Sequence, residues 1–144
     1  MTRYVIGPDV ALYLAEQEAV VAARHQLLAP TLLRSQVLSL LYVAVQRADI
    51  SRKDAERRLD YLRGLRMRLL GDRALQQRAW KVADQFEWPD TYVAEYIALT
   101  QLQADAFITL DTQLARTVDG AVKVATIDDL LDRRRRSASV RATT

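Results

Sequence analysis

Short apolar runs alternate along the chain with longer stretches whose apolar residues lie three and four positions apart. The short runs predict buried strands, which we expect at 3–6, 26–29, 66–70, 106–110 and 122–125. The longer stretches predict helices at 10–18, 32–48, 51–64, 73–86, 89–102, 113–117 and 128–136. Strands that alternate with helices indicate a parallel sheet covered on both faces. We therefore expect a three-layer α/β/α domain with a central, mainly parallel sheet of about 4–5 strands.

Polar residues stand where several of these helices are expected to begin. Asp9 precedes the first helix and is predicted to be its N-cap, with a side-chain oxygen that accepts from free backbone amides. Ser51 and Asp54 have the spacing of a capping box. Asp72 is placed to cap the helix that follows it. These residues fix the predicted helix starts.

The composition is that of one globular domain. The chain has 144 residues, half of them apolar, and a net charge of +3, which is enough for one core and too little for two. We expect a single domain over 1–132 and a basic, flexible tail over 133–144. Because the chain has no cysteine, no apolar run of membrane-spanning length and no signal-peptide pattern, we expect a cytoplasmic protein.

Parallel sheets bind ligands outside the carboxyl ends of their strands. By this rule the chemistry belongs at four places, which are the bend at Gly7, the helix after Pro30, the helix after Pro89, and Asp111. No glycine-rich phosphate loop is present, and the single histidine, His25, gives no basis for a catalytic triad. A site built from carboxylates at the sheet edge is the remaining candidate.

Two adjacent motifs carry a resemblance to a known family. They are Thr91–Thr100 (TYVAEYIALT) and Ala106–Ala115 (AFITLDTQLA), with weaker matches at Leu69–Leu75 and Val122–Leu130. Through these motifs the chain resembles a PIN domain, most closely the VapC-type toxins of bacterial toxin–antitoxin systems. The resemblance covers about residues 3–132.

The resemblance implies an endoribonuclease that uses Mg²⁺ or Mn²⁺ held by four clustered acids, since hard cations prefer oxygen ligands. It also implies a homodimer that a small antitoxin-type protein inhibits. Matched by position, the four family acids fall on Gly7, Gln36, Val93 and Asp111. Asp111 is therefore the only retained candidate for a catalytic and metal-binding acid, and we expect Mg²⁺ or Mn²⁺ binding to be weak or absent.

Other acids lie near the replaced positions. Asp9 is either the N-cap already described or a displaced metal ligand. Asp90 lies one turn before Val93, where it is also suited to capping, whereas Glu95 lies about 200° around the helix from Val93. A rebuilt metal site would have to combine Asp9, Asp90, Glu95 and Asp111.

Several side chains suited to RNA have a simpler interpretation. One basic cluster forms either a lip for phosphates or a solvated helix face paired with nearby acids; it contains Arg57, Arg58, Arg63, Arg66 and Arg68. A second cluster is either an RNA contact or a solubilising run; it contains Arg133, Arg134, Arg135 and Arg136. Trp80 and Trp88 are interpreted as packing anchors rather than platforms for bases.

Three functions remain open at this stage. The chain is expected to be a pseudo-nuclease that binds RNA or an antitoxin-type protein without cutting. One alternative is an active Mg²⁺- or Mn²⁺-dependent endoribonuclease toxin that uses Asp111 with relocated acids. The other is a pure protein-interaction module. The loss of three of the four aligned acids weakens the enzyme hypothesis most.

Overall fold

A five-stranded sheet in the order β3-β2-β1-β4-β5 forms the centre of the computed structural model, which describes residues 1–131. All neighbouring strands are parallel. The strands are β1 (Thr2–Ile6), β2 (His25–Pro30), β3 (Met67–Leu70), β4 (Ala106–Ile108) and β5 (Val124–Ala125). The expected parallel sheet is confirmed.

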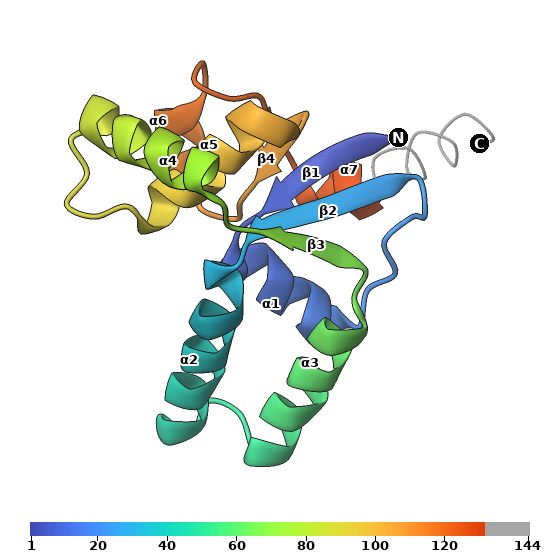
Figure 1. Cartoon of the computed structure of the whole chain (residues 1–144). Helices are drawn as coiled ribbons and strands as arrows, with labels where there is room; N and C mark the ends of the chain where they lie inside the picture. Colours follow the sequence, from blue (N-terminus) through green and yellow to red (C-terminus); the bar gives the residue numbers. More distant parts are fainter. Residues whose placement is uncertain (132–144) are drawn as a thin grey trace.

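Helices cover both faces of this sheet (Figure 1). One side carries α1 (Pro8–Gln17), α2 (Leu32–Gln46) and α3 (Arg52–Gly64). The other side carries α4 (Arg73–Phe86), α5 (Tyr92–Gln103) and α6 (Thr112–Val118), and the last described helix is α7 (Ile127–Leu131). The three-layer α/β/α architecture expected from the sequence is therefore confirmed.

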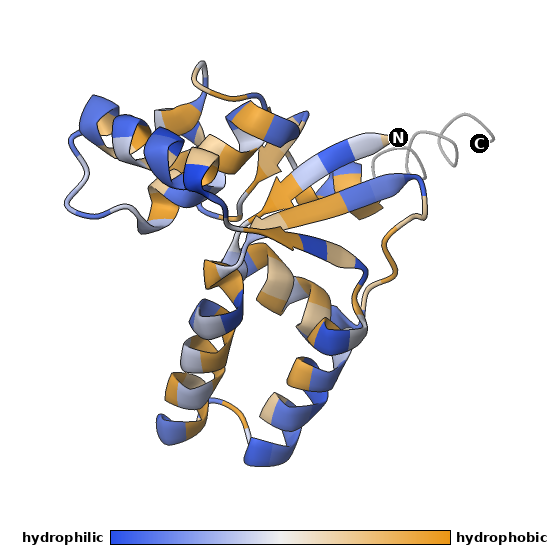
Figure 2. Cartoon of the chain, in the orientation of Figure 1, coloured by the Kyte–Doolittle hydropathy of each residue, from blue (hydrophilic) through white to orange (hydrophobic). Residues whose placement is uncertain are grey.

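The core lies at the middle of the sheet. Val5 and Ile6 of β1 are completely buried, as are Ala29 of β2 and Ile108 of β4. Figure 2 shows β1 and β2 as polar where they begin and apolar toward their carboxyl ends, while α3 presents a mostly hydrophilic surface. The apolar ends are the buried parts of both strands, where neither side of the sheet meets water.

Two of the predicted caps are confirmed. The Ser51 side chain accepts a hydrogen bond from the Asp54 amide at 3.0 Å, and the Asp72 side chain accepts from the Leu75 amide at 2.9 Å. Side-chain oxygens at these positions replace the partners that the first turn of a helix lacks. Helices α3 and α4 therefore begin where their polar residues indicate.

The prediction for Asp9 is wrong. Helix α1 begins at Pro8, Gly7 is its N-cap, and Asp9 is already inside the first turn. Proline is favoured at the first helical position, because an amide hydrogen there would have no acceptor within the helix and its absence costs nothing. The carboxylate of Asp9 is consequently free to bind another segment of the chain.

Some other boundaries also differ from the prediction. The expected strand 106–110 ends at Ile108, and the expected strand 122–125 is reduced to Val124–Ala125. The end of the predicted helix 128–136 lies outside the described residues. Within residues 1–131, no helix combines the length and apolar character needed to cross a membrane.

Candidate functional site

A small pocket of about 160 Å³ opens at the carboxyl edge of the sheet, where β1 and β4 end. We call it the sheet-edge pocket. Its walls come from four separate parts of the chain: Gly7, Pro8, Asp9, Gln36, Val93, Tyr96, Phe107, Thr109, Asp111 and Leu114. The pocket lies where ligands bind in other parallel-sheet domains.

The four positions that the family resemblance matches to acids all line this pocket. Gly7 follows β1, Gln36 is in the second turn of α2, Val93 is in the first turn of α5, and Asp111 caps α6. The convergence is a property of the fold, since these positions are far apart in the sequence. Among the four, Asp111 contributes the only carboxylate.

Asp9 contributes a second carboxylate, which is held in place on both oxygens. Its Oδ2 accepts from Thr109 Oγ1 at 2.9 Å and from the Leu110 amide at 2.8 Å. Its Oδ1 accepts from the Val10 amide at 2.8 Å. The carboxylate thus joins the start of α1 to the turn after β4, and this turn begins where the sequence predicted two further strand residues.

Asp111 has a structural role at the start of α6. Its Oδ1 accepts from the backbone amides of Gln113 and Leu114, each at 3.0 Å. Its own amide donates to Thr109 Oγ1 at 3.1 Å. The residue therefore caps a short helix, in addition to lining the pocket.

A neutral hydrogen bond links the two remaining polar walls. The Tyr96 hydroxyl donates to Gln36 Oε1 at 2.5 Å, and Tyr96 is only 3 % exposed. Burial raises the pKa of Tyr96 well above its usual value, and the charges of Glu95 and Asp9 raise it further. The phenol is therefore protonated at neutral pH, and the carbonyl oxygen of Gln36 supplies the acceptor that its proton requires.

Asp90 and Glu95 do not line the pocket. Asp90 Oδ1 accepts from the Tyr92 amide at 3.2 Å, close to the start of α5. Glu95 lies in the first turn of α5, and partial burial raises its pKa. Within the described part of the chain, no three His, Cys, Asp or Glu side chains lie close enough to share a metal ion. The rebuilt four-acid set is not assembled.

The pocket is a poor match for Mg²⁺ or Mn²⁺. Mg²⁺ takes about six oxygen ligands in near-octahedral geometry, usually one or two free carboxylates together with waters and substrate phosphates. Of the four carboxylate oxygens of Asp9 and Asp111, three already accept hydrogen bonds from the protein. The Gln36 carbonyl is also used, and the Val93 side chain has no oxygen. These residues do not form the metal site that the resemblance implies.

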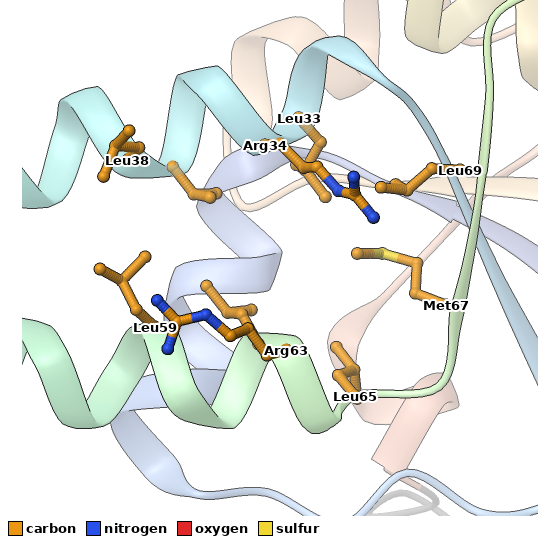
Figure 3. Close-up of a pocket in the computed structure, with 10 residues that line it drawn as sticks. Leu33, Arg34, Leu38, Leu59, Arg63, Leu65, Met67 and Leu69 are labelled. Atoms are coloured by element: carbon orange, nitrogen blue, oxygen red, sulfur yellow. The ribbon is translucent and has the colours of Figure 1, made fainter.

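A larger apolar groove of about 450 Å³ runs between α2 and α3 and reaches β3. We call it the interhelical groove; it is lined by Leu33, Arg34, Val37, Leu38, Leu59, Leu62, Arg63, Leu65, Met67 and Leu69. In Figure 3 the side chains of Arg34 and Arg63 project into it among the apolar ones. A second hollow continues it between the same two helices and shares Leu38, Leu59 and Arg63.

The sequence did not reveal this groove. The apolar spacing predicts helix α2 but not its exposed apolar residues: Leu38 is 56 % exposed and Leu40 is 47 % exposed, on different sides of the helix. The available signal was the lack of any charged residue from 35 to 46, which is unusual for a helix with so much exposed surface. The exposed apolar side chains make α2 a candidate interaction surface.

Among the described residues, the arginine, tryptophan and histidine side chains singled out in the sequence lie outside the sheet-edge pocket. Arg57 is 2.8 Å from Asp54, and Arg63 pairs with Asp60, which supports the solvated-face interpretation for both arginines. Trp80 is 69 % exposed, so its prediction as a packing anchor is wrong. Trp88 stacks on Phe86, and His25 packs edge-on against Tyr4. The run Arg133–Arg136 lies outside the described residues.

No protein-family model and no curated protein matches the chain. Among solved structures, the fold is similar to the crystal structure of PAE2754 from Pyrobaculum aerophilum. The two share 19 % sequence identity with a TM-score of 0.69, over 92 % of this chain and 94 % of the other. At that identity the likeness establishes a shared fold across nearly the whole domain.

Proposed function

We propose that the chain is a VapC-like PIN-domain protein that has lost its metal site and acts as a pseudo-nuclease, binding an antitoxin-type protein or RNA without cutting. One observation carries the proposal: the four positions matched to the family acids converge in one pocket, and three of them have no carboxylate. Where the family clusters four acids, this pocket combines the carboxylates of Asp9 and Asp111 with a neutral hydrogen bond and apolar walls.

This replacement removes the chemical basis of cleavage. In a metal-dependent nuclease, the bound cation activates the attacking water and stabilises the charge that develops on the phosphate. The sheet-edge pocket instead presents two carboxylates that are engaged in holding backbone segments. Repulsion between these carboxylates and an RNA phosphate would not be offset by a cation.

The interhelical groove favours a protein partner. Its apolar floor and the basic side chain of Arg34 suit an amphipathic helix that carries an acidic residue. The apolar residues exposed elsewhere on α2, Leu40 and Val43, are available for a homodimer contact. We place the protein in the cytoplasm, where an antitoxin-type partner would be made together with it.

Incubation of the pure protein with mixed transcripts tests the loss of activity. We expect cleavage in about 10 mM Mg²⁺ or Mn²⁺ to be no greater than cleavage in EDTA. Cleavage that depends on Mg²⁺, stops with EDTA and is lost in Asp111→Asn would contradict the proposal and support the enzyme alternative.

The neighbouring gene provides a second test. We expect a short reading frame directly upstream that encodes a DNA-binding fold with a trailing basic segment. Co-expression of the two proteins should give a complex that survives size-exclusion chromatography in EDTA. A stable complex only in the presence of a divalent metal would contradict a partner site that works without one.

A further inference from the structure

Glycine at position 7 has no explanation in the backbone. Its φ and ψ angles are −75° and 168°, an extended conformation that any residue adopts. Its amide donates to the Ile108 carbonyl at 3.2 Å, a bond that other residues would also make. The requirement for glycine must therefore come from the space around its α-carbon.

That space is filled by the carboxylate of Asp9. A β-carbon at position 7 would lie 2.7 Å from Asp9 Oδ1, which is too close for any real contact. The next atoms are Asp9 Cγ at 3.8 Å and the Ile108 carbonyl oxygen at 3.9 Å, both at ordinary contact distance. Among the nearest atoms in the described part of the chain, Asp9 Oδ1 alone is close enough to exclude a β-carbon at position 7.

The Asp9 carboxylate cannot move aside without loss. It accepts three hydrogen bonds, from Val10, Thr109 and Leu110, and two of them reach across to the turn after β4. The same turn leads to Asp111, whose amide donates to Thr109 Oγ1. Displacing the carboxylate would leave these donors without their partner, at a cost comparable to lost hydrogen bonds.

We propose that Asp9 is a positioning residue that occupies the place of a side chain at position 7 and clamps the two sides of the sheet-edge pocket together in place of a metal ion. A metal-binding site would hold these segments by shared coordination, whereas Asp9 does so with its own hydrogen bonds. The inference deepens the proposed function, on which it rests, because it explains how the pocket keeps its shape without a cation.

A double-mutant cycle measured by thermal unfolding tests the clamp. Gly7→Ala should lower Tm by about 3–5 °C, because the new β-carbon displaces the carboxylate. Asp9→Ser should also lower Tm, and Gly7→Ala added to Asp9→Ser should cause no further loss. If the two effects simply add, the carboxylate and the side chain at position 7 do not compete, and the proposal is overturned.

Gly64→Ala is the matched control, because a β-carbon at Gly64 meets nothing within 4 Å. It should leave Tm unchanged or raise it slightly. Should Gly7→Ala fail to fold, recovery of folding by Asp9→Ser in the double variant supports the competition. If Gly7→Ala and the double variant both fail to fold while Asp9→Ser alone folds, the competition is contradicted.

A second arm uses Mn²⁺ as the probe and Tm as the readout. The triple variant Gly7→Asp, Gln36→Glu, Val93→Asp should show no rise in Tm with Mn²⁺, because Asp9 still occupies the first position. Adding Asp9→Ser should produce a rise of several degrees. If Mn²⁺ changes Tm equally in the triple variant and in the variant that also carries Asp9→Ser, the inference about Asp9 is overturned. A response in the unmodified protein would instead contradict the proposed loss of the metal site.

Discussion

At the scale of single residues, the pair formed by Tyr96 and Gln36 is the clearest chemical feature of the sheet-edge pocket. A buried hydroxyl needs an acceptor, and the amide oxygen of Gln36 provides one without a charge. A glutamate at position 36 would place a carboxylate beside the phenol and beside Asp9. The neutral residue therefore adds no negative charge to a pocket that Asp9 and Asp111 already line.

Removing the phenol hydroxyl tests this pair. We expect Tyr96→Phe to lower the free energy of unfolding by about 1 kcal/mol, since the half-buried Gln36 oxygen loses its donor. Urea denaturation followed by circular dichroism measures the change. Tyr92→Phe is the control. Because Tyr92 is 54 % exposed, loss of its hydroxyl should leave the free energy of unfolding almost unchanged. Equal effects would contradict a specific role for the pair.

Alkaline pH offers an independent check. The raised pKa of Tyr96 means that the folded protein keeps this proton at a pH where the unfolded chain has released it. Stability from Tyr96 is therefore complete below about pH 10, the unfolded pKa, and is lost as the pH rises beyond that value. We expect the free energy of unfolding to fall progressively as the pH rises above about 10. Tyr96→Phe should reduce this fall to the part that comes from Tyr61, whose pKa burial also raises.

The sequence located the pocket residues but not their contacts. Gly7, Gln36, Val93 and Asp111 could be identified because motifs fixed their places relative to strands and helices. The role of Asp9 could not, because an acid before a helix resembles an N-cap until the first helical residue is known. Pro8 was the available signal, since proline favours that first position and leaves Gly7 as the cap.

At the scale of elements, α6 depends on one side chain for its start. Asp111→Ala should lower the free energy of unfolding by about 1 kcal/mol, because two backbone amides lose their acceptor. Asp111→Asn keeps an oxygen in the same place and should cost much less. Thermal unfolding of both variants separates the capping role from the charge, and equal losses would assign the effect to the charge.

The interhelical groove gives a prediction for α2 and α3. Once an antitoxin-type partner is available, Leu38→Asp should weaken its binding at least about tenfold, because Leu38 lines both hollows between the helices. Ser39→Asp is a matched control on the same helix, because Ser39 is exposed and has no part in the groove. Isothermal titration calorimetry compares the two variants. A greater loss with Ser39→Asp would place the partner elsewhere on α2.

Elements were easier to predict than the spaces between them. Helix α4 was predicted at its observed bounds, because Asp72 caps it and its apolar spacing is regular. The end of β4 was not, because the Asp9 carboxylate draws Thr109 and Leu110 into a turn. The groove between α2 and α3 depends on how far apart the two helices lie, which no local pattern encodes.

At the scale of the whole molecule, the sheet order brings the ends of β1 and β4 together, since these strands are neighbours although about 100 residues separate them. This adjacency creates the pocket whatever residues line it. The similarity to PAE2754 extends over nearly the entire length of both chains, so the arrangement is not restricted to this sequence. Chemistry at the site is decided by a few side chains.

A titration with Mn²⁺ examines the intact protein. We expect no saturable binding below about millimolar metal, because too few free anionic oxygens converge. Electron paramagnetic resonance of free Mn²⁺ measures the bound fraction, and EDTA should leave Tm unchanged. Tight binding that Asp9→Asn or Asp111→Asn abolishes would restore the nuclease hypothesis.

The mutual exclusion of a residue-7 side chain and the Asp9 carboxylate has an evolutionary consequence. In a chain with aspartate at position 9, a substitution that adds a side chain at position 7 gives a less stable protein unless Asp9 changes as well. Selection for stability alone therefore preserves glycine at position 7. Descendants of such a protein would retain the Gly-Pro-Asp sequence even while the surrounding pocket diverges.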